Sequence, residues 1–332
     1  MNRTLASLLL ALALCFVAAC RPVTDPGTVA TAGPARANPP ATANIPATES
    51  GAPTFSEQIV TFENAGATIV GTLALPEAGS GPYPVALLLH GFTNERNELP
   101  VGATGETMYG RLARELGAQG IASLRIDFRG SGESDGAWAD TTFTGQLGDA
   151  QAAVDYLAAL PAVDVARLGV VGFSQGGLIA AELAAQDERI RSLVLWSPVA
   201  SAPDTYKHIL GDESVAAGLV ADAPLPVTTQ WGAQFELNRG FFVDLFRYDP
   251  TAAIAAVEAP LLVIVGLRDT TVTPQPAYGE LYLAYHDGAE RLVTLDSDHV
   301  FNVLTDAEPT IFDGALAWST TWLADTLLAP KP

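Results

Sequence analysis

The sequence predicts an α/β fold in which a mostly parallel central sheet is flanked by helices and carries one cap insertion. From residue 85 onward, short apolar runs of strand length alternate with segments whose apolar residues recur at helical spacing. The run at residues 85–89 is continuously apolar, which is typical of a strand that is buried on both faces. Alternating strands and helices favour parallel strands joined by helices that pack on the sheet.

The domain opens with two expected strands at residues 59–63 and 68–75, separated by the turn at residues 64–66. The later strands are expected at residues 85–89, 121–126, 168–173, 192–196, 261–265 and 292–295. Helices are expected at residues 108–116, 147–160, 176–185, 275–285 and 309–328. Pro161 ends the second of these helices, because proline cannot continue a helical hydrogen-bond pattern.

Residues 197–250 break this alternation. The segment is too long for a simple connection, and its middle shows no regular period. Its apolar content includes the aromatic residues Tyr206, Trp231, Phe235, Phe241, Phe242 and Phe246. In a compact domain, a long insertion of this kind is usually a lid or a binding element. We therefore expect residues 197–250, called the cap below, to cover the functional site.

Residues 1–20 are typical of a targeting segment. Arg3 precedes an apolar run at residues 5–19, which is shorter than the roughly 20 residues of a membrane span and fits a signal peptide. The run ends in Val17-Ala18-Ala19-Cys20, which resembles a bacterial lipobox. We therefore expect Cys20 to be lipidated and to become the new N-terminus of an extracytoplasmic protein. The alternative is an ordinary signal peptide cleaved near Ala19, which would release a secreted protein.

Residues 21–53 predict a disordered linker, and residues 54–332 predict one globular domain. The linker is rich in Pro, Ala and Thr and contains no aromatic residue, so it cannot bury enough surface to offset its ordering entropy. The chain has only two cysteines, Cys15 and Cys20. Removal of the leader would leave Cys20 alone, so we expect no intramolecular disulfide, which a domain of this size does not need.

The formal net charge of −20 argues against nucleic acid and against an anionic membrane as partners, apart from attachment through the lipid anchor. It is compatible with a small, neutral substrate. No cluster of His, Cys and carboxylate residues has metal-site spacing. The glycine-rich loop at residues 127–134 lacks the full spacing of a dinucleotide or phosphate loop, so a structural loop is expected there. We expect neither a metal nor a cofactor.

The sequence Gly172-Phe173-Ser174-Gln175-Gly176 follows an expected strand and opens an expected helix. This is the context of the G-x-S-x-G nucleophile elbow, in which a serine sits on a strained turn between small neighbours. A chance glycine-rich turn is the alternative. A serine hydroxyl needs a base that takes its proton, normally a histidine oriented by a carboxylate.

His299 is the expected base. It follows the strand at residues 292–295, on a loop beyond the strand's carboxyl end. His286 is the other histidine after the cap, and we expect it to be a solvated surface residue at the end of a helix. His90 precedes the serine, which is the wrong chain order for this fold, so we expect a structural hydrogen-bonding role for it.

Asp269 is the expected acid. It stands after the strand at residues 261–265 and before His299, as the order serine, acid, histidine requires. An aspartate in a turn or at a helix cap is the alternative interpretation. Asp296 and Asp298 are rivals, but they share the loop of His299, from which the far imidazole nitrogen is awkward to reach.

The negative charge that develops on a substrate oxygen needs two backbone donors. The amide of Gln175, directly after the serine, is the first expected donor. The second should come from the loop that begins His90-Gly91-Phe92, where the glycine permits close approach and Phe92 presents its amide.

Together these blocks resemble the α/β-hydrolases, and within them the bacterial cinnamoyl/feruloyl esterase-like group. The resemblance covers roughly residues 57–328. Its blocks, in the family's order, are residues 90–94 with Arg96-Asn97, residues 127–136, residues 172–177, Asp269 with Val272 and Pro274, and residues 298–301.

The resemblance implies an α/β-hydrolase fold whose insertion caps the site. It also implies ester hydrolysis through an acyl-enzyme, with Ser174, Asp269 and His299 as the triad and the amides of Phe92 and Gln175 as the oxyanion hole. Hydroxycinnamoyl or other small acyl esters are the substrates that it suggests. Two alternatives stay open, an acyl- or aminopeptidase-like serine hydrolase and a non-catalytic lipoprotein that uses the same fold for binding.

Overall fold

The computed structural model describes residues 55–329, so the predicted leader, Cys20 and the linker at residues 21–53 lie outside the described residues. Eight strands form one sheet in the order β1-β2-β4-β3-β5-β6-β9-β10. Strand β2 runs antiparallel to both of its neighbours, and all other neighbouring pairs are parallel. The predicted α/β fold with a mostly parallel sheet is confirmed.

Each of the predicted strands overlaps one strand of this sheet. The strands are β1 (Phe55–Asn64), β2 (Ala67–Pro76), β3 (Tyr83–Leu89), β4 (Ala122–Ile126), β5 (Val163–Phe173), β6 (Ile190–Trp196), β9 (Leu261–Gly266) and β10 (Glu290–Leu295). The helices outside the cap are α1 (Met108–Ala118), α2 (Phe143–Ala158), α3 (Gln175–Gln186), α7 (Pro250–Ile254), α8 (Ala277–Tyr285) and α9 (Thr310–Leu327).

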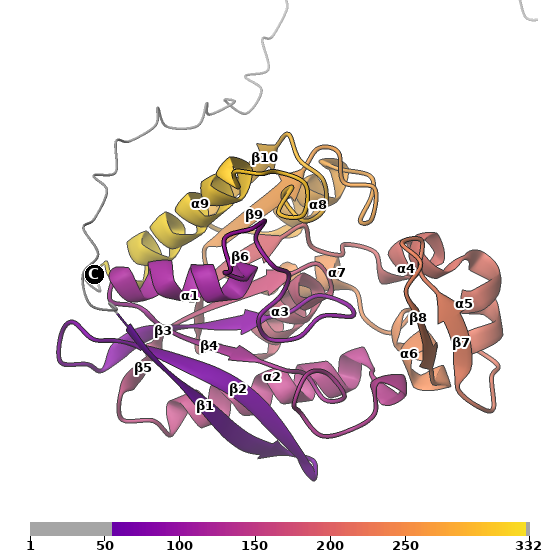
Figure 1. Ribbon diagram of the computed structural model, residues 1–332, viewed down its shortest axis with the longest axis horizontal. Helices are drawn as coiled ribbons and strands as arrows, with labels where there is room; N and C mark the ends of the chain where they lie inside the picture. The colour runs from indigo at the N-terminus through magenta and orange to yellow at the C-terminus, as the bar shows by residue number, and fades with distance from the viewer. Residues whose placement is uncertain (1–54, 330–332) are drawn as a thin grey trace, which may run out of the picture. The chain divides into compact units, whose positions relative to one another are not determined.

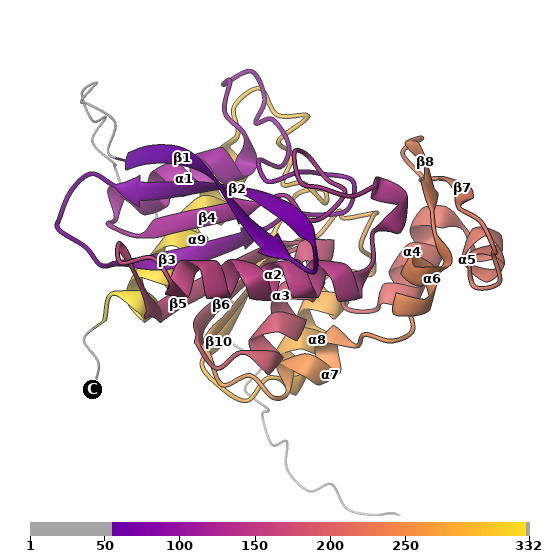
Figure 2. The same ribbon diagram turned by 90° about the horizontal axis from the view of Figure 1, so that it is seen from below.

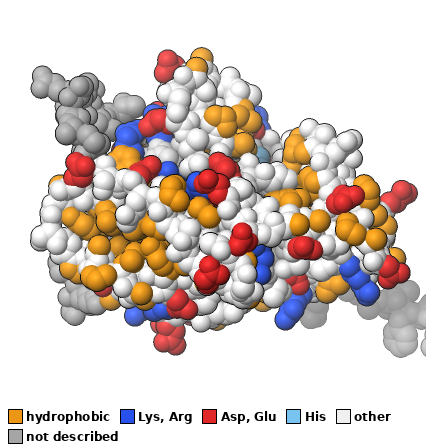
Figure 3. Space-filling model, turned by 60° about the horizontal axis from the view of Figure 1, so that its bottom comes forward, with side chains coloured by type: hydrophobic (Ala, Val, Ile, Leu, Met, Phe, Trp, Pro, Cys, Tyr) orange, Lys and Arg blue, Asp and Glu red, His pale blue; other side chains and the backbone are white. Residues whose placement is uncertain are grey.

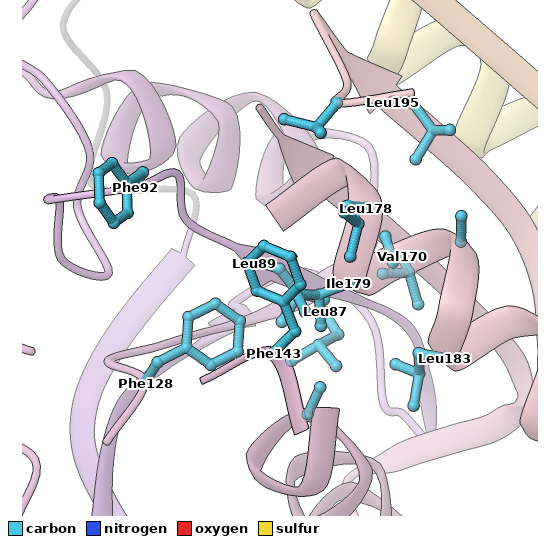
Figure 4. Packing of buried hydrophobic residues seen from close by; sticks show 14 of the residues in the cluster. Leu87, Leu89, Phe92, Phe128, Phe143, Val170, Leu178, Ile179, Leu183 and Leu195 are labelled. Atoms are coloured by element: carbon cyan, nitrogen blue, oxygen red, sulfur yellow. The ribbon is translucent and has the colours of Figure 1, made fainter. Parts of the chain in front are cut away.

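Helices cover both faces of the sheet. Alternate residues of a strand point to opposite faces, and both faces here carry apolar side chains that the helices bury. On one face, Leu87 and Leu89 of β3 join a buried cluster with Val154 of α2 and Ile179 of α3. On the other face, Leu88 belongs to a second cluster with residues of α1 and α9. Figure 1 shows α1 and α9 on one side of the sheet and α2 on the other, and Figure 4 shows part of the first cluster. Burial on both faces explains the continuous apolar run at residues 85–89 of β3.

The beginnings of two helices differ from the prediction. Helix α2 begins at Phe143, four residues earlier than expected, because the side chain of Thr142 accepts a hydrogen bond from the amide of Gly145 (2.9 Å). Such a cap satisfies an amide that has no partner within the helix. Helix α8 begins two residues later than expected, at Ala277. Apolar periodicity detects the buried stripe of a helix, and hydrogen bonds at its ends decide where it starts.

The cap contains more regular structure than its sequence predicts. Its elements are α4 (Ala202–Leu210), α5 (Asp212–Gly218), the antiparallel pair β7 (Leu225–Thr228) and β8 (Gln234–Leu237), and α6 (Arg239–Asp244). They are too short for a periodic pattern to stand out over the 11–18 residues that such a pattern needs. Figures 1 and 2 show them grouped at one end of the sheet, beyond the tips of the parallel strands.

Several hydrogen bonds join the cap to the segment around the start of α2. The amide of Thr144 donates to the Asp244 carboxylate (2.8 Å), and the amide of Asn238 donates to the Ala139 carbonyl (2.8 Å). Hydrophobic side chains lie on the surface of the cap (Figure 3). Among the cap residues, Phe246 is 53% exposed. None of the helices in residues 55–329 is long and apolar enough to cross a membrane.

Candidate active site

Ser174 stands between the end of β5 and the start of α3 with φ 54° and ψ −114°, a strained conformation for a residue with a side chain. The glycines on either side are needed for close packing. A Cβ atom at Gly172 would lie 2.2 Å from the carbonyl oxygen of Gly176, and one at Gly176 would lie 2.0 Å from the carbonyl oxygen of Leu89. The geometry is that of a sharp strand-to-helix turn, which presents the serine hydroxyl at the carboxyl end of β5.

The structure brings Ser174, His299 and Asp269 into one hydrogen-bonded line. His299 Nε2 lies 3.1 Å from Ser174 Oγ, and His299 Nδ1 lies 2.7 Å from Asp269 Oδ2. With a proton on Nδ1, the imidazole donates to Asp269 and leaves Nε2 able to accept the serine proton. The arrangement can therefore increase the nucleophilicity of the Ser174 hydroxyl.

Asp269 is oriented by its own backbone loop. Its Oδ1 atom accepts hydrogen bonds from the amides of Thr271 (2.8 Å) and Val272 (2.9 Å), which leaves Oδ2 for His299. Its side chain has no exposed surface. The two amides fix the orientation of the buried carboxylate, so that Oδ2 faces the imidazole.

The rival carboxylates face other partners. Asp296 pairs with the guanidinium of Arg268 and is largely exposed. Asp298 accepts hydrogen bonds from the amides of Val300 (3.1 Å) and Asn302 (2.7 Å), so it organises the loop that carries the histidine. Neither reaches the imidazole of His299.

The expectation for His286 was wrong, because this residue is buried. Its ring nitrogens lie 3.1 Å from the Ala259 carbonyl and 3.1 Å from the Glu290 carboxylate. The end of α8 packs against the loop before β9, and a helical pattern read by itself cannot show that neighbour. The ring nitrogens of His286 contact Ala259 and Glu290 and do not contact Ser174, Asp269 or His299.

His90 has the structural surroundings that its position predicts. Its Nδ1 atom lies 2.8 Å from the Gly91 carbonyl, and its Nε2 atom accepts a hydrogen bond from the Phe128 amide (3.2 Å). Burial lowers the pKa of His90 to about 4, so the ring is neutral near pH 7. It supports the loop that continues to Phe92.

Phe92 lies in the loop after β3 and Gln175 lies at the start of α3, the two segments that meet where Gly176 approaches Leu89. Gln175 is the first residue of α3, so its amide points outward at the positive end of the helix dipole. Phe92 lies in the loop after β3, which packs against the elbow where Leu89 approaches Gly176. Neither amide donates to another protein group within residues 55–329. Both are available to a developing oxyanion.

Glu98 is a feature of this loop that the sequence analysis missed. Its carboxyl group accepts hydrogen bonds from the amide of Gly91, the residue before Phe92, and from Asn94 Nδ2 (2.5 Å). Burial raises the pKa of Glu98 to about 8, against the opposing effect of these hydrogen bonds. No sequence pattern identifies a buried glutamate in so polar a segment.

The loop at residues 127–134 holds the same region from the other side. The buried carboxylate of Asp127 accepts from the Arg96 amide (2.7 Å) and pairs with the Arg96 guanidinium. A Cβ atom at Gly132 would lie 2.3 Å from that carboxylate, so the glycine is needed for the loop to close around it. The loop is structural, as its sequence predicts.

Rings from the cap and from the segment before α2 surround Phe92. We define the aromatic cluster as Phe92, Trp138, Tyr206, Phe235 and Phe241. The Phe92 centroid lies 5.6, 5.1, 5.4 and 5.5 Å from those of the other four, in that order. These spacings are typical of favourable aromatic pairs. The side of the site next to Phe92 is therefore apolar and is formed largely by the cap.

Other surface features do not coincide with the triad. Two hollows of about 200 and 480 Å³ are lined, respectively, by residues around Arg96 and Arg125 and by residues around Phe62 and Tyr156. Neither is lined by Ser174, Asp269 or His299. The part of the chain that the structure describes contains no group of three His, Cys, Asp or Glu residues placed to hold a metal ion.

Comparison with known proteins places this geometry in a family. A family model described as the alpha/beta hydrolase fold matches residues 84–235. An uncharacterized 31.7 kDa protein from the traX-finO intergenic region of Escherichia coli is 31% identical over 252 residues, which cover 67% of this chain and 84% of that protein. Esterase EstD of Thermotoga maritima is 25% identical over 268 residues, 77% of this chain and 61% of its own. The chain spans 35% of the length of two further curated relatives that it matches.

Solved structures show the same fold. Est1E from Butyrivibrio proteoclasticus, solved with ferulic acid bound, superimposes with a TM-score of 0.63 at 22% identity, covering 80% of this chain and 99% of that one. The predicted resemblance is confirmed at the level of the fold and of esterase-like relatives. This chain belongs to the α/β-hydrolase family.

Proposed function

We propose that this protein hydrolyses carboxylic esters through an acyl-enzyme formed on Ser174. The observation that carries the proposal is the line of hydrogen bonds from Ser174 Oγ to His299 Nε2 (3.1 Å) and from His299 Nδ1 to Asp269 Oδ2 (2.7 Å). A strained serine beside a base that a carboxylate orients is the arrangement that acyl transfer requires. Esterase-like relatives support this reaction class.

In the first half of the reaction, Ser174 Oγ attacks the ester carbonyl carbon and its proton passes to His299 Nε2. The carbonyl oxygen becomes negative and accepts hydrogen bonds from the amides of Phe92 and Gln175. The tetrahedral intermediate then expels the alcohol, which leaves with the proton from His299. The products of this step are the free alcohol and an ester between the acyl group and Ser174.

In the second half, a water molecule attacks the acyl carbon and gives a proton to His299. The new intermediate again places its negative oxygen at the two amides. Its collapse releases the carboxylic acid and returns the proton to Ser174 Oγ. The protein therefore ends the cycle in its starting protonation state, and no cofactor enters the balance.

We further propose small, uncharged acyl esters, including hydroxycinnamoyl esters, as the substrate class. Planar aromatic or apolar groups suit the aromatic cluster, where rings pack at centroid distances between 5.1 and 5.6 Å around Phe92. The net charge of −20 disfavours anionic substrates. We also propose an extracytoplasmic location, because residues 1–20 have the pattern of a lipoprotein leader.

The test is hydrolysis of a panel by the wild-type chain, Ser174→Ala and Ser201→Ala. The panel contains p-nitrophenyl acetate, butyrate and octanoate, methyl ferulate and an aminoacyl p-nitroanilide. We expect ester turnover that falls by about 10⁴-fold or more in Ser174→Ala. Ser201, whose hydroxyl donates to Asp204 (2.8 Å) on the cap, is the matched control and should leave turnover unchanged.

The ranking of the panel separates the alternatives. Faster turnover of methyl ferulate than of the acetate would support an aromatic acyl site. Preference for the anilide would replace the esterase proposal with a peptidase-like activity. Absence of Ser174-dependent turnover of every member would overturn the proposed reaction.

A further inference from the structure

A buried tyrosine of the cap contacts both residues whose amides face the proposed oxyanion. Tyr206 on α4 is 1% exposed, and its hydroxyl donates a hydrogen bond to Gln175 Oε1. Its ring also meets the Phe92 ring edge-on, with centroids 5.1 Å apart and planes at 87°. One cap side chain thus touches the two otherwise separate halves of the oxyanion hole.

The side chain of Gln175 is held at both ends of its amide. Oε1 accepts from Tyr206 of the cap, and Nε2 donates to Gln146 Oε1 of α2 (2.7 Å). Gln146 in turn donates to Thr141 Oγ1 (3.3 Å). Gln175 and Gln146 are each 1% exposed, so no water is available to replace a lost partner. The orientation of Gln175 therefore depends on a cap residue.

The tyrosine hydroxyl is a fixed donor in this network. Burial raises the pKa of Tyr206 well above its ordinary value, so the hydroxyl keeps its proton throughout the working pH range. Stacking of Phe241 and Phe92 (5.5 Å, 24°) and the edge contact of Tyr206 with Phe241 (5.0 Å, 85°) hold the ring in place. A rigid donor of this kind can transmit the position of the cap to Gln175.

Resting on the proposed function, we infer that Tyr206 is a positioning residue that couples docking of the cap to formation of the oxyanion hole. With the cap seated, the Tyr206–Gln175 hydrogen bond and the Tyr206–Phe92 ring contact hold both amides toward the reacting oxygen. With the cap displaced, both contacts are lost together, and the nucleophile remains but its oxyanion stabilisation is weakened. The cap thus governs turnover as well as binding.

The test compares Tyr206→Phe with Tyr248→Phe in the full chain. Both substitutions remove one hydroxyl from a tyrosine on the cap side that reaches α2 or α3. Tyr248 shares its hydrogen bond with Thr144 Oγ1 (2.8 Å) and does not contact Gln175. We expect Tyr206→Phe to lower kcat about 10- to 100-fold with KM nearly unchanged, as for loss of a transition-state contact. Tyr248→Phe should leave both within about twofold.

A double-mutant cycle tests the route of the effect. Gln175→Met removes the side-chain amide and keeps the backbone donor. If Tyr206 acts through Gln175, adding Tyr206→Phe to Gln175→Met should cause little further loss of kcat. Independent, additive losses, or an effect of Tyr206→Phe on KM alone, would overturn the inference.

A small alkyl fluorophosphonate separates this inference from the proposed ester specificity. Ser174 Oγ would give its proton to His299 and bond to phosphorus as fluoride leaves, and the phosphoryl oxygen would occupy the oxyanion hole whatever ester the protein prefers. We expect labelling of Tyr206→Phe to be slower than that of wild type by the same factor as kcat. If no ester of the panel is cleaved, labelling rates still decide the role of Tyr206. Failure of the wild-type chain to label would overturn both proposals.

Discussion

The imidazole of His299 lies between Ser174 and the buried carboxylate of Asp269, with its Nδ1 atom 2.7 Å from Asp269 Oδ2. Asp269 and His299 are 30 positions apart, on loops that follow the neighbouring parallel strands β9 and β10. The carboxyl ends of adjacent parallel strands meet at one edge of a sheet, so this register brings the Asp269 carboxylate to the Nδ1 atom of His299. It also explains why Asp269, rather than a carboxylate on the histidine's own loop, reaches the ring.

Asp269→Asn should lower kcat by about 10⁴-fold with little change in folding, because the amide no longer stabilises the required imidazole tautomer. Asp296→Asn is the matched control, since Asp296 is exposed and pairs with Arg268. Steady-state ester kinetics and thermal unfolding of both variants check the prediction. Comparable losses in the two variants would assign the acid role elsewhere.

Gly176→Ala should prevent correct folding of the elbow. The new Cβ would lie 2.0 Å from the Leu89 carbonyl oxygen, so β3 and α3 would have to separate. Gly314→Ala is the matched control, because nothing lies within 4 Å of a Cβ at this position of α9. That variant should be stabilised by about 0.5–1 kcal/mol. Urea unfolding measures both, and equal stabilities would contradict the packing argument.

The contribution of Glu98 to the stability of the protein should fall as the pH rises from about 4.5 to about 8. Burial raises the pKa of Glu98 from 4.5 to about 8, so over this range the folded state keeps a proton that the unfolded state has released. The Glu98 contribution is thus complete below pH 4.5 and is lost as the pH approaches 8.

Glu98→Gln should remove this part of the pH dependence, because glutamine resembles the protonated acid. We expect the variant to gain stability over wild type near pH 8, on the order of a few kcal/mol at most. The exposed Glu308→Gln is the control. Unfolding curves at several pH values provide the measurement, and parallel curves for wild type and Glu98→Gln would show that Glu98 is ionised in the folded protein.

Phe235→Ala should raise KM for methyl ferulate several-fold more than KM for p-nitrophenyl acetate. Phe235 packs against both Phe92 (5.4 Å) and Trp138 (5.8 Å), so its loss opens the apolar side of the site. Phe246→Ala is the matched control, since that cap residue is 53% exposed and outside the aromatic cluster. Equal changes in KM for the two substrates would show that the aromatic cluster does not recognise the acyl group.

Cys20→Ser should abolish lipid attachment if the leader is a lipoprotein signal. The wild-type chain expressed in a bacterium should incorporate labelled palmitate and sediment with membranes, and the variant should do neither. A wild-type chain that is released without label would favour the ordinary signal peptide cleaved near Ala19.

The apolar runs in the sequence were enough to predict the sheet, because a strand that is buried on both faces is mostly apolar, as residues 85–89 are. It also identified the turn at Ser174, since the crowding that demands glycine at positions 172 and 176 is local to that turn. The order of residues along the chain favoured Asp269 among the candidate acids and His299 among the candidate bases. Each of these inferences used residues within one element and the loop that follows it.

Which groups meet across the fold became clear from the three-dimensional arrangement of the elements. The burial of His286 against Ala259 and the hydrogen bond from Tyr206 to Gln175 join residues of different elements. The hydrogen bond from the Gly91 amide to Glu98 closes the loop after β3 on itself. The partners in these contacts are set by how the loops and the cap close over the strand ends, and no periodic pattern records that closure. The sequence does not show whether a polar side chain is solvated or buried, so its hydrogen bonds and its role follow only from its neighbours in the structure.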